Sequence, residues 1–190
     1  MKNILITALL AALVTFIWSS ISWMVLPFHN MSIHKMKNED QMIEMMKQNL
    51  GKTRVYAFPA MDENNPDKAG QEAAIAEKYR TGPMGMIFYH AEGGDMMDAK
   101  QFIFGFLLDF VIAGVSIFLL IFAVDKLPKY LYRVLFVTGI GLIAALSSHI
   151  MSWNWMLFPM KYSLLNAADL VATFFFAGLI AAWRIKPQAT

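Results

Sequence analysis

The chain has 190 residues, of which 57% are hydrophobic and 16% charged, with no cysteine and a net charge of +2. Soluble domains carry about 25% charged residues, so the low charged fraction favours a membrane protein. The lack of cysteine excludes disulfides, thiolate metal sites and thiol redox chemistry. The sequence also has no glycine-rich nucleotide motif, no nucleophile elbow and no basic stripe, so we expect neither nucleotide nor nucleic acid as a partner.

Four long apolar runs are the main feature of the sequence. They cover residues 4–26, 102–124, 134–153 and 162–183. Each approaches or exceeds the ~20 apolar residues that cross the hydrocarbon core of a bilayer. The first run could instead be a cleaved signal peptide, because Lys2 precedes it and Ser20-Ile21-Ser22 resembles a cleavage site. We favour a retained membrane helix because the apolar character continues to Phe28.

The Lys and Arg residues that flank these runs predict their orientation. Positive residues gather at both termini and in the loop after the second run, which places these parts on the cytoplasmic side. They are Lys2, Lys126, Lys129, Arg133, Arg184 and Lys186. Residues 28–100 have no positive bias, so we expect them outside. The predicted organisation is a first membrane helix over 1–27, an outer segment over 28–100, and three further membrane helices over 101–190 with a cytoplasmic carboxyl terminus.

The outer segment has the pattern of a small folded unit. Caps, apolar spacing and turn residues predict a helix over about 40–50, a strand over 54–58, a second helix over 71–80 and a second strand over 84–90. A unit of about 60 residues is small for independent stability. The predicted fold class is therefore an all-α membrane protein, a bundle of four transmembrane helices with a small α/β extracytoplasmic cap between helices one and two.

Two similar blocks, WMVLP and WMLFP, end the first run and follow the third. Tryptophan is favoured at the boundary between lipid and water. Proline ends a helix or opens the next one because it lacks an amide hydrogen. With the predicted orientation both blocks lie at the outer boundary, so we interpret Trp23, Pro27, Trp155 and Pro159 as interface anchors.

Small and polar residues recur at helical spacing in all four runs, which is typical of membrane helices that pack closely. Depth along the helices places several polar side chains in the outer half of the bundle. We predict an intramembrane polar cluster of Asp109, His149, Asn166, Asp169, Ser19 and Ser22. Ionisable residues inside a membrane are costly and are candidates for a functional site. The alternative is that Asp109 pairs with a serine or with His149 and only fixes the register of the helices.

A second candidate site lies just after the first run. His29, Met31, His34 and Met36 place two imidazoles and two thioethers within eight residues. This ligand set suits copper, above all Cu(I). The competing interpretation is that these methionines fill gaps in packing and that the histidines lie at the level of the lipid headgroups.

The stretches IWSSISWMVLPFHN (residues 17–30) and YRTGPMGMIFYH (residues 79–90) resemble small four-helix inner-membrane proteins of uncharacterised function from bacteria. The resemblance implies a multi-pass protein of the bacterial inner membrane, whose outer segment is periplasmic. It implies no activity and transfers no catalytic residue.

Three functions are compatible with the sequence. The first is a non-enzymatic accessory or assembly subunit that binds other membrane proteins or further copies of itself; it is favoured by the lack of a catalytic motif. The second is a small carrier or relay for protons or a metal ion that uses Asp109, Asp169 and His149. The third is a membrane enzyme with a site beneath the cap, near His29, His90 and His149. No cofactor is required by the sequence.

Overall fold

A computed structural model describes residues 2–187 of the chain. The protein is mostly helical, with four helices long and apolar enough to cross a membrane and one small two-stranded sheet. It forms two compact units, which are described separately: residues 35–96 make one, and the flanking residues before and after them make the other.

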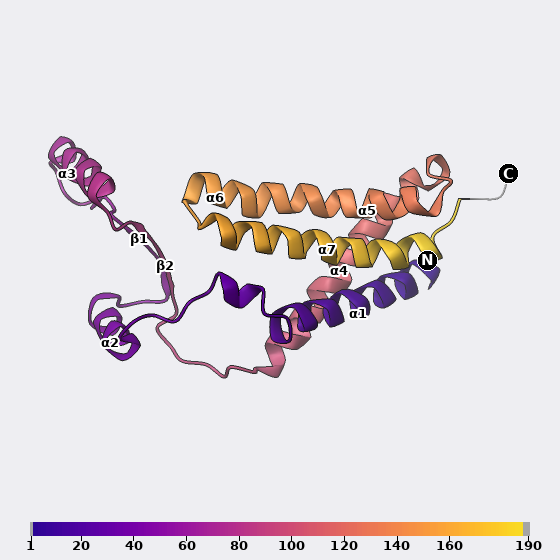
Figure 1. Ribbon diagram of the computed structural model, residues 1–190, viewed down its shortest axis with the longest axis horizontal. Coiled ribbons are helices and arrows are strands. Elements are labelled where there is room, and N and C mark those ends of the chain that lie inside the picture. Colours follow the sequence, from indigo (N-terminus) through magenta and orange to yellow (C-terminus); the bar gives the residue numbers. More distant parts are fainter. Residues whose placement is uncertain (1, 188–190) are drawn as a thin grey trace. The chain divides into compact units, whose positions relative to one another are not determined.

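The first unit consists of the four long helices (Figure 1). They are α1 (Lys2–Met24), α4 (Ala99–Ala123), α5 (Tyr130–Ala145) and α7 (Met160–Arg184). A π-helical turn (Leu146–Ile150) joins α5 without a break to the short helix α6 (Met151–Met156). All four predicted apolar runs are therefore helical, except that α1 ends at Met24, two residues before the end of the first run. Pro159 stands immediately before the first residue of α7, as expected from its fixed φ.

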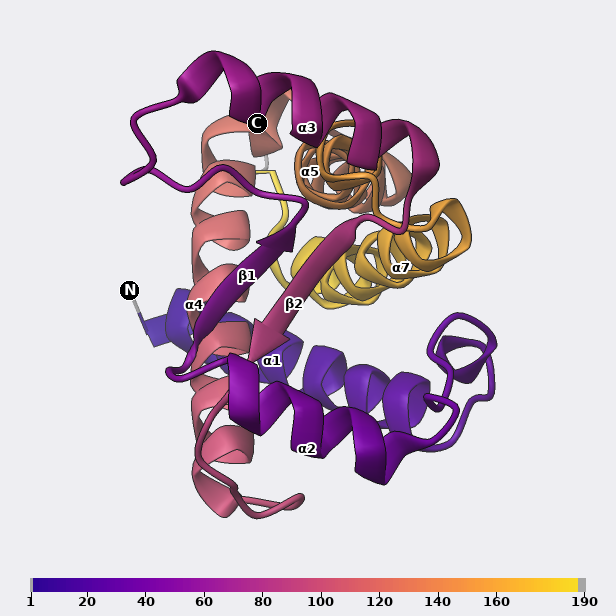
Figure 2. The same ribbon diagram turned by 90° about the vertical axis from the view of Figure 1, so that its left-hand side faces the viewer.

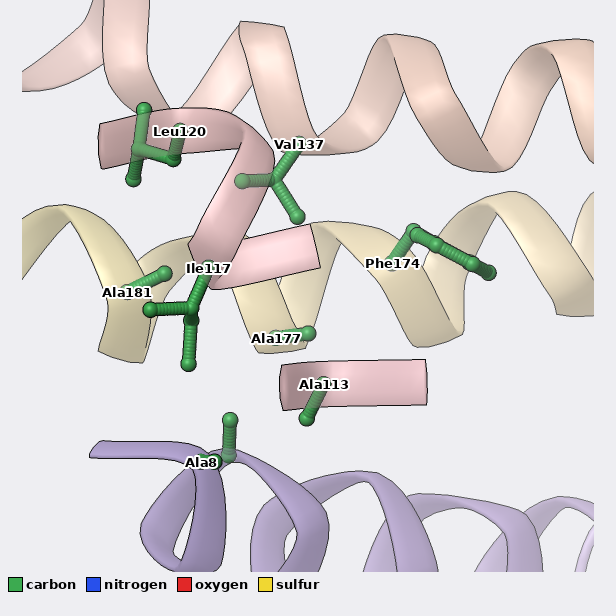
Figure 3. Packing of buried hydrophobic residues seen from close by; sticks show 9 residues of the cluster. Ala8, Ala113, Ile117, Leu120, Val137, Phe174, Ala177 and Ala181 are labelled. Carbon is green, nitrogen blue, oxygen red and sulfur yellow. The ribbon is translucent and has the colours of Figure 1, made fainter. Parts of the chain in front are cut away.

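The helices pack through small side chains and turn their large apolar side chains outward. Helix α5 lies along α7, and α1 packs against both α4 and α7. Figure 3 shows where the helices meet: Ala8 of α1, Ala113 and Ile117 of α4, Val137 of α5 and Ala177 of α7 belong to one buried cluster. Most of the exposed Leu, Ile and Phe side chains of these helices lie on the opposite faces. Such an arrangement suits helices surrounded by lipid.

Two glycines set the distance between α5 and α7. A Cβ atom at Gly141 would collide with the side chain of Phe174. A Cβ at Gly178 would lie 3.0 Å from the backbone oxygen of Val134. The two backbones can approach this closely only because neither position carries a side chain.

A buried arginine closes the end of the α5–α7 pair. Arg133 is 5% exposed, and its guanidinium donates to the carbonyl of Ala182 in the last turn of α7 and to the carbonyls of Leu127 and Pro128. Carbonyls at the end of a helix lack partners within the helix. The arginine satisfies one such acceptor in α7 and two carbonyls of the connection before α5, and it places its positive charge at the negative end of α7.

The second unit has the predicted order of helix, strand, helix and strand, and its two strands form the small sheet. Its elements are α2 (Glu39–Asn49), β1 (Arg54–Phe58), α3 (Lys68–Thr81) and β2 (Gly85–Tyr89). The two strands pair antiparallel, with Arg54 opposite Tyr89 and Phe58 opposite Gly85 (Figure 2). None of residues 35–96, all of which the structure describes, is buried.

Candidate functional site: a polar cavity between the long helices

A cavity of about 290 Å³ lies within the first unit, among α1, α4, α7 and the π-helical turn after α5. Its polar wall includes Ser19, Asp109, Ser116, His149, Asn166 and Asp169, together with Thr15 and Thr173. Five of the six residues of the predicted polar cluster therefore line one cavity. The sixth, Ser22, lies behind the wall, where it donates a hydrogen bond to Asp169.

Local structure explains how three helices and a turn supply these groups. Asp109 lies near the middle of α4, ahead of Ile112, Ala113 and Ser116 on the same side of the helix. His149 belongs to the π-helical turn. Wider turns of this kind frequently occur at functional sites, because the extra residue changes which side chains face inward.

Asp169 is held by donors from a different helix. Its Oδ1 accepts hydrogen bonds from Trp18 Nε1 at 2.9 Å and from Ser22 Oγ at 2.7 Å. Its Oδ2 lies 3.5 Å from His29 Nε2, and the side chain is only 10% exposed. These donors replace water around a buried carboxylate and fix its orientation at the cavity wall.

His29 completes this group because the chain folds back after α1. A short 3-10 turn (His29–Met31) carries the imidazole against the helix that precedes it, where it is 2% exposed. The ring stacks on Trp23 with centroids 3.8 Å apart and an angle of 12° between the planes. Its Nε2 lies 3.1 Å from Ser22 Oγ. Stacking and hydrogen bonding together hold the imidazole beside Asp169.

The hydrogen bonds show which group donates to which among His29, Ser22 and Asp169. Ser22 has one hydroxyl hydrogen, which it gives to Asp169. The bond between His29 and Ser22 must then be donated by Nε2 of the imidazole. His29 Nδ1 is buried and has no hydrogen-bond partner among the described residues. The serine thus lies between imidazole and carboxylate, unlike a nucleophilic triad, in which the imidazole is in the middle.

Asp109 is placed differently from Asp169. It is half-buried and lines the same cavity, but its carboxylate forms no hydrogen bond or ion pair with another described residue. One carboxylate of the cavity is therefore fixed by its neighbours, and the other is open to whatever occupies the cavity.

The predicted copper ligands have different surroundings from one another. His29 Nε2 points to Ser22 and Asp169, whereas Met31 and His34 are exposed. Met36 is exposed and belongs to the second unit. Across residues 2–187, no group of three or more His, Asp or Glu side chains is arranged to hold a metal ion.

The predicted interface anchors lie at the ends of the helices. Trp23 is about half exposed, stacks on His29 and also reaches the wall of the cavity. Pro27 follows the end of α1, Trp155 in α6 is 71% exposed, and Pro159 precedes α7. Their location at a membrane boundary stays a prediction.

Trp18 was not among the predicted site residues. The signal for it was present, since Trp18 lies four residues before Ser22 and shares its helix face. An indole N–H in the middle of an apolar helix also needs a buried acceptor.

Comparison of the chain with protein-family models, with curated proteins and with solved structures finds no match. The resemblance to small bacterial inner-membrane proteins therefore stays an expectation.

Proposed function

We propose that this protein is an integral membrane protein that binds a cation in the cavity between its helices and acts as a carrier or relay for it. One observation carries the proposal. Asp109, Asp169 and His149 line one cavity among helices that are apolar enough to cross a membrane. Each Asp costs roughly 2.5–3.5 kcal/mol at the centre of a membrane helix on insertion scales, so ionisable residues placed there mark ion and proton pathways.

The two carboxylates have separate roles in this proposal. Asp169 is the fixed group, because Trp18 and Ser22 hold its Oδ1. Asp109 is the exchangeable group, because no described residue competes with a cation for its oxygens. A cation or proton on Asp109 is attracted by the charge of Asp169 in a region of low dielectric. His149 supplies a third acceptor on the same wall.

The charge distribution supports a topology for the proposed carrier. Helices α1 and α7 are antiparallel neighbours, because Ser22 contacts Asp169 while Trp18 contacts Phe176, further along α7. The start of α1 and the end of α7 therefore lie at the same end of the bundle, where Arg184 is found. By the positive-inside rule we propose that this end is cytoplasmic, that residues 28–100 are periplasmic, and that the membrane is the bacterial inner membrane.

Proton flux into proteoliposomes tests the proposal. The purified full chain is reconstituted with an internal pH dye, and a potassium gradient with valinomycin drives protons inward. We expect flux above that of protein-free vesicles, and its loss in Asp109→Asn and in Asp169→Asn. Asp95→Asn, which changes an exposed carboxylate of the second unit, is the matched control and should keep the flux. Flux in both cavity variants equal to that of the wild type would contradict the relay.

A second function is favoured by residues 35–96. This unit buries none of its side chains, although Met45, Val55, Phe58, Met84 and Phe88 are large and apolar. A two-stranded sheet is marginal in water without further packing. We propose that the unit binds a partner membrane protein, as an accessory or assembly subunit would. Purification in a mild detergent should then recover a stoichiometric partner, and a Val55→Asp variant should lose it. Recovery of the chain alone would count against this role.

A further inference from the structure

The wall of the cavity offers more hydrogen-bond acceptors than free donors. Thr15, Ser116 and Thr173 line it, and their hydroxyls donate to backbone carbonyls of their own helices at 3.0, 2.9 and 3.0 Å. Asn166 donates in the same way at 2.7 Å. A hydroxyl that has given its hydrogen keeps its lone pairs as acceptors. With the two carboxylates added, the wall matches an occupant that brings its own N–H donors.

The size and the apolar part of the wall favour an organic cation over a bare ion. At about 30 Å³ for each water-sized group, the cavity of 290 Å³ holds about ten non-hydrogen atoms. Ile112, Leu170 and Phe174 supply apolar surface beside the carboxylates, and Trp23 supplies an indole. Aromatic rings attract ammonium groups through their faces. No described group of His, Asp or Glu is arranged to hold a metal ion.

We propose that the cavity binds a small organic ammonium ion of about ten non-hydrogen atoms, consisting of a primary ammonium group and a compact apolar body. The ammonium group lies against Asp109 and Asp169, and the apolar body lies against Leu170 and Phe174. The inference rests on the proposed function, because it names the class of cation that the cavity takes.

Phenethylamine is a suitable probe, because it has nine non-hydrogen atoms and its amine is protonated near neutral pH, as that of lysine is. Binding of the radiolabelled compound is measured on the full chain in lipid nanodiscs, with empty nanodiscs as the blank. Propylbenzene has nearly the same shape and no charge. We expect saturable binding of phenethylamine that propylbenzene does not displace. Benzyltrimethylammonium keeps the charge and lacks N–H donors, so it should compete at least tenfold less well.

Two substitutions connect the binding to the cavity. Asp109→Asn should weaken phenethylamine binding at least tenfold, because it removes a charged hydrogen-bond acceptor. Asp95→Asn should leave it unchanged. Ser19→Leu fills the cavity without changing its charge and should also abolish binding; Ser19 forms no hydrogen bond with another described side chain. Circular dichroism verifies that each variant is folded. If Asp109→Asn does not fold, phenethylamine binding by Ser19→Leu decides whether the amine occupies the cavity.

The inference is overturned if wild type shows no saturable binding, if propylbenzene displaces the amine, or if the folded cavity variants bind as the wild type does. Proton flux without amine binding would remove this ligand class and keep the relay. Amine binding without proton flux would remove the relay and keep the cavity as a site for organic cations.

Discussion

Replacing Trp18 with phenylalanine should weaken the contact between α1 and α7 by about 1 kcal/mol. The substitution keeps an aromatic ring against Phe176, whose centroid is 4.8 Å from that of Trp18. It shortens the ring and removes the hydrogen bond from Nε1 to Asp169 Oδ1 at 2.9 Å. Hydrogen bonds to charged groups contribute about 1.5–3 kcal/mol in general. Hydrogen bonds between membrane helices contribute less, about 0.6 kcal/mol on average and up to about 1.7 kcal/mol. Because Ser22 still donates to the same oxygen, we expect a loss within this smaller range for membrane helices.

Ser22→Ala should cost more, about 1–2 kcal/mol, because this hydroxyl contacts both Asp169 and His29. The double variant should lose more than the sum of the two single losses, because only then is Asp169 Oδ1 left without either donor. Unfolding is followed by circular dichroism in mixed micelles of dodecyl maltoside and sodium dodecyl sulfate. Trp155→Phe, at a position that is 71% exposed, is the control and should stay within about 0.5 kcal/mol of wild type. Equal stabilities for Trp18→Phe and Trp155→Phe would refute the assignment of this hydrogen bond.

The remaining predictions concern helix packing and topology. Gly141→Ala should destabilise the bundle by about 1–3 kcal/mol in the same assay, because its Cβ would collide with Phe174. A Cβ at Gly139 would meet no other atom, so Gly139→Ala should be neutral or stabilising by up to about 1 kcal/mol. A loss of stability as large as that of Gly141→Ala would contradict the close packing of α5 on α7 at Gly141. Because the chain has no native cysteine, single cysteines report topology directly. In intact spheroplasts an impermeant maleimide should label Glu63→Cys and not Lys126→Cys, and the reverse pattern would invert the proposed orientation.

The four long helices could be predicted because each is a nearly uncharged run long enough to cross a bilayer, and a helix satisfies every backbone group of such a run within the segment itself. Much of the cavity wall could also be predicted. Asp109, Asn166 and Asp169 are polar residues in apolar helices, where a polar side chain must face protein or water. Depth along the helix then places them at similar levels.

The position of His29 could not be predicted. It depends on a turn of three residues after Pro27 and on a carboxylate in another helix, distant in the sequence. The local sequence instead grouped His29 with Met31, His34 and Met36 as candidate copper ligands. The π-helical turn that carries His149 was also missed, because one extra residue in a turn leaves the apolar pattern almost unchanged.

The most direct test of the central claim compares two introduced cysteines on α1. Ser19→Cys lies on the wall of the cavity, whereas Ile17→Cys lies on the outer face, where Ile17 is 49% exposed. In membranes, aminoethyl methanethiosulfonate, which carries a primary ammonium group, should modify Ser19→Cys and leave Ile17→Cys unmodified. It should also react with Ser19→Cys at least tenfold faster than the negatively charged sulfonatoethyl reagent, because the carboxylates concentrate cations in the cavity. Modification of Ile17→Cys but not Ser19→Cys, or equal rates for the two reagents, would contradict a water-accessible, cation-selective cavity between the helices.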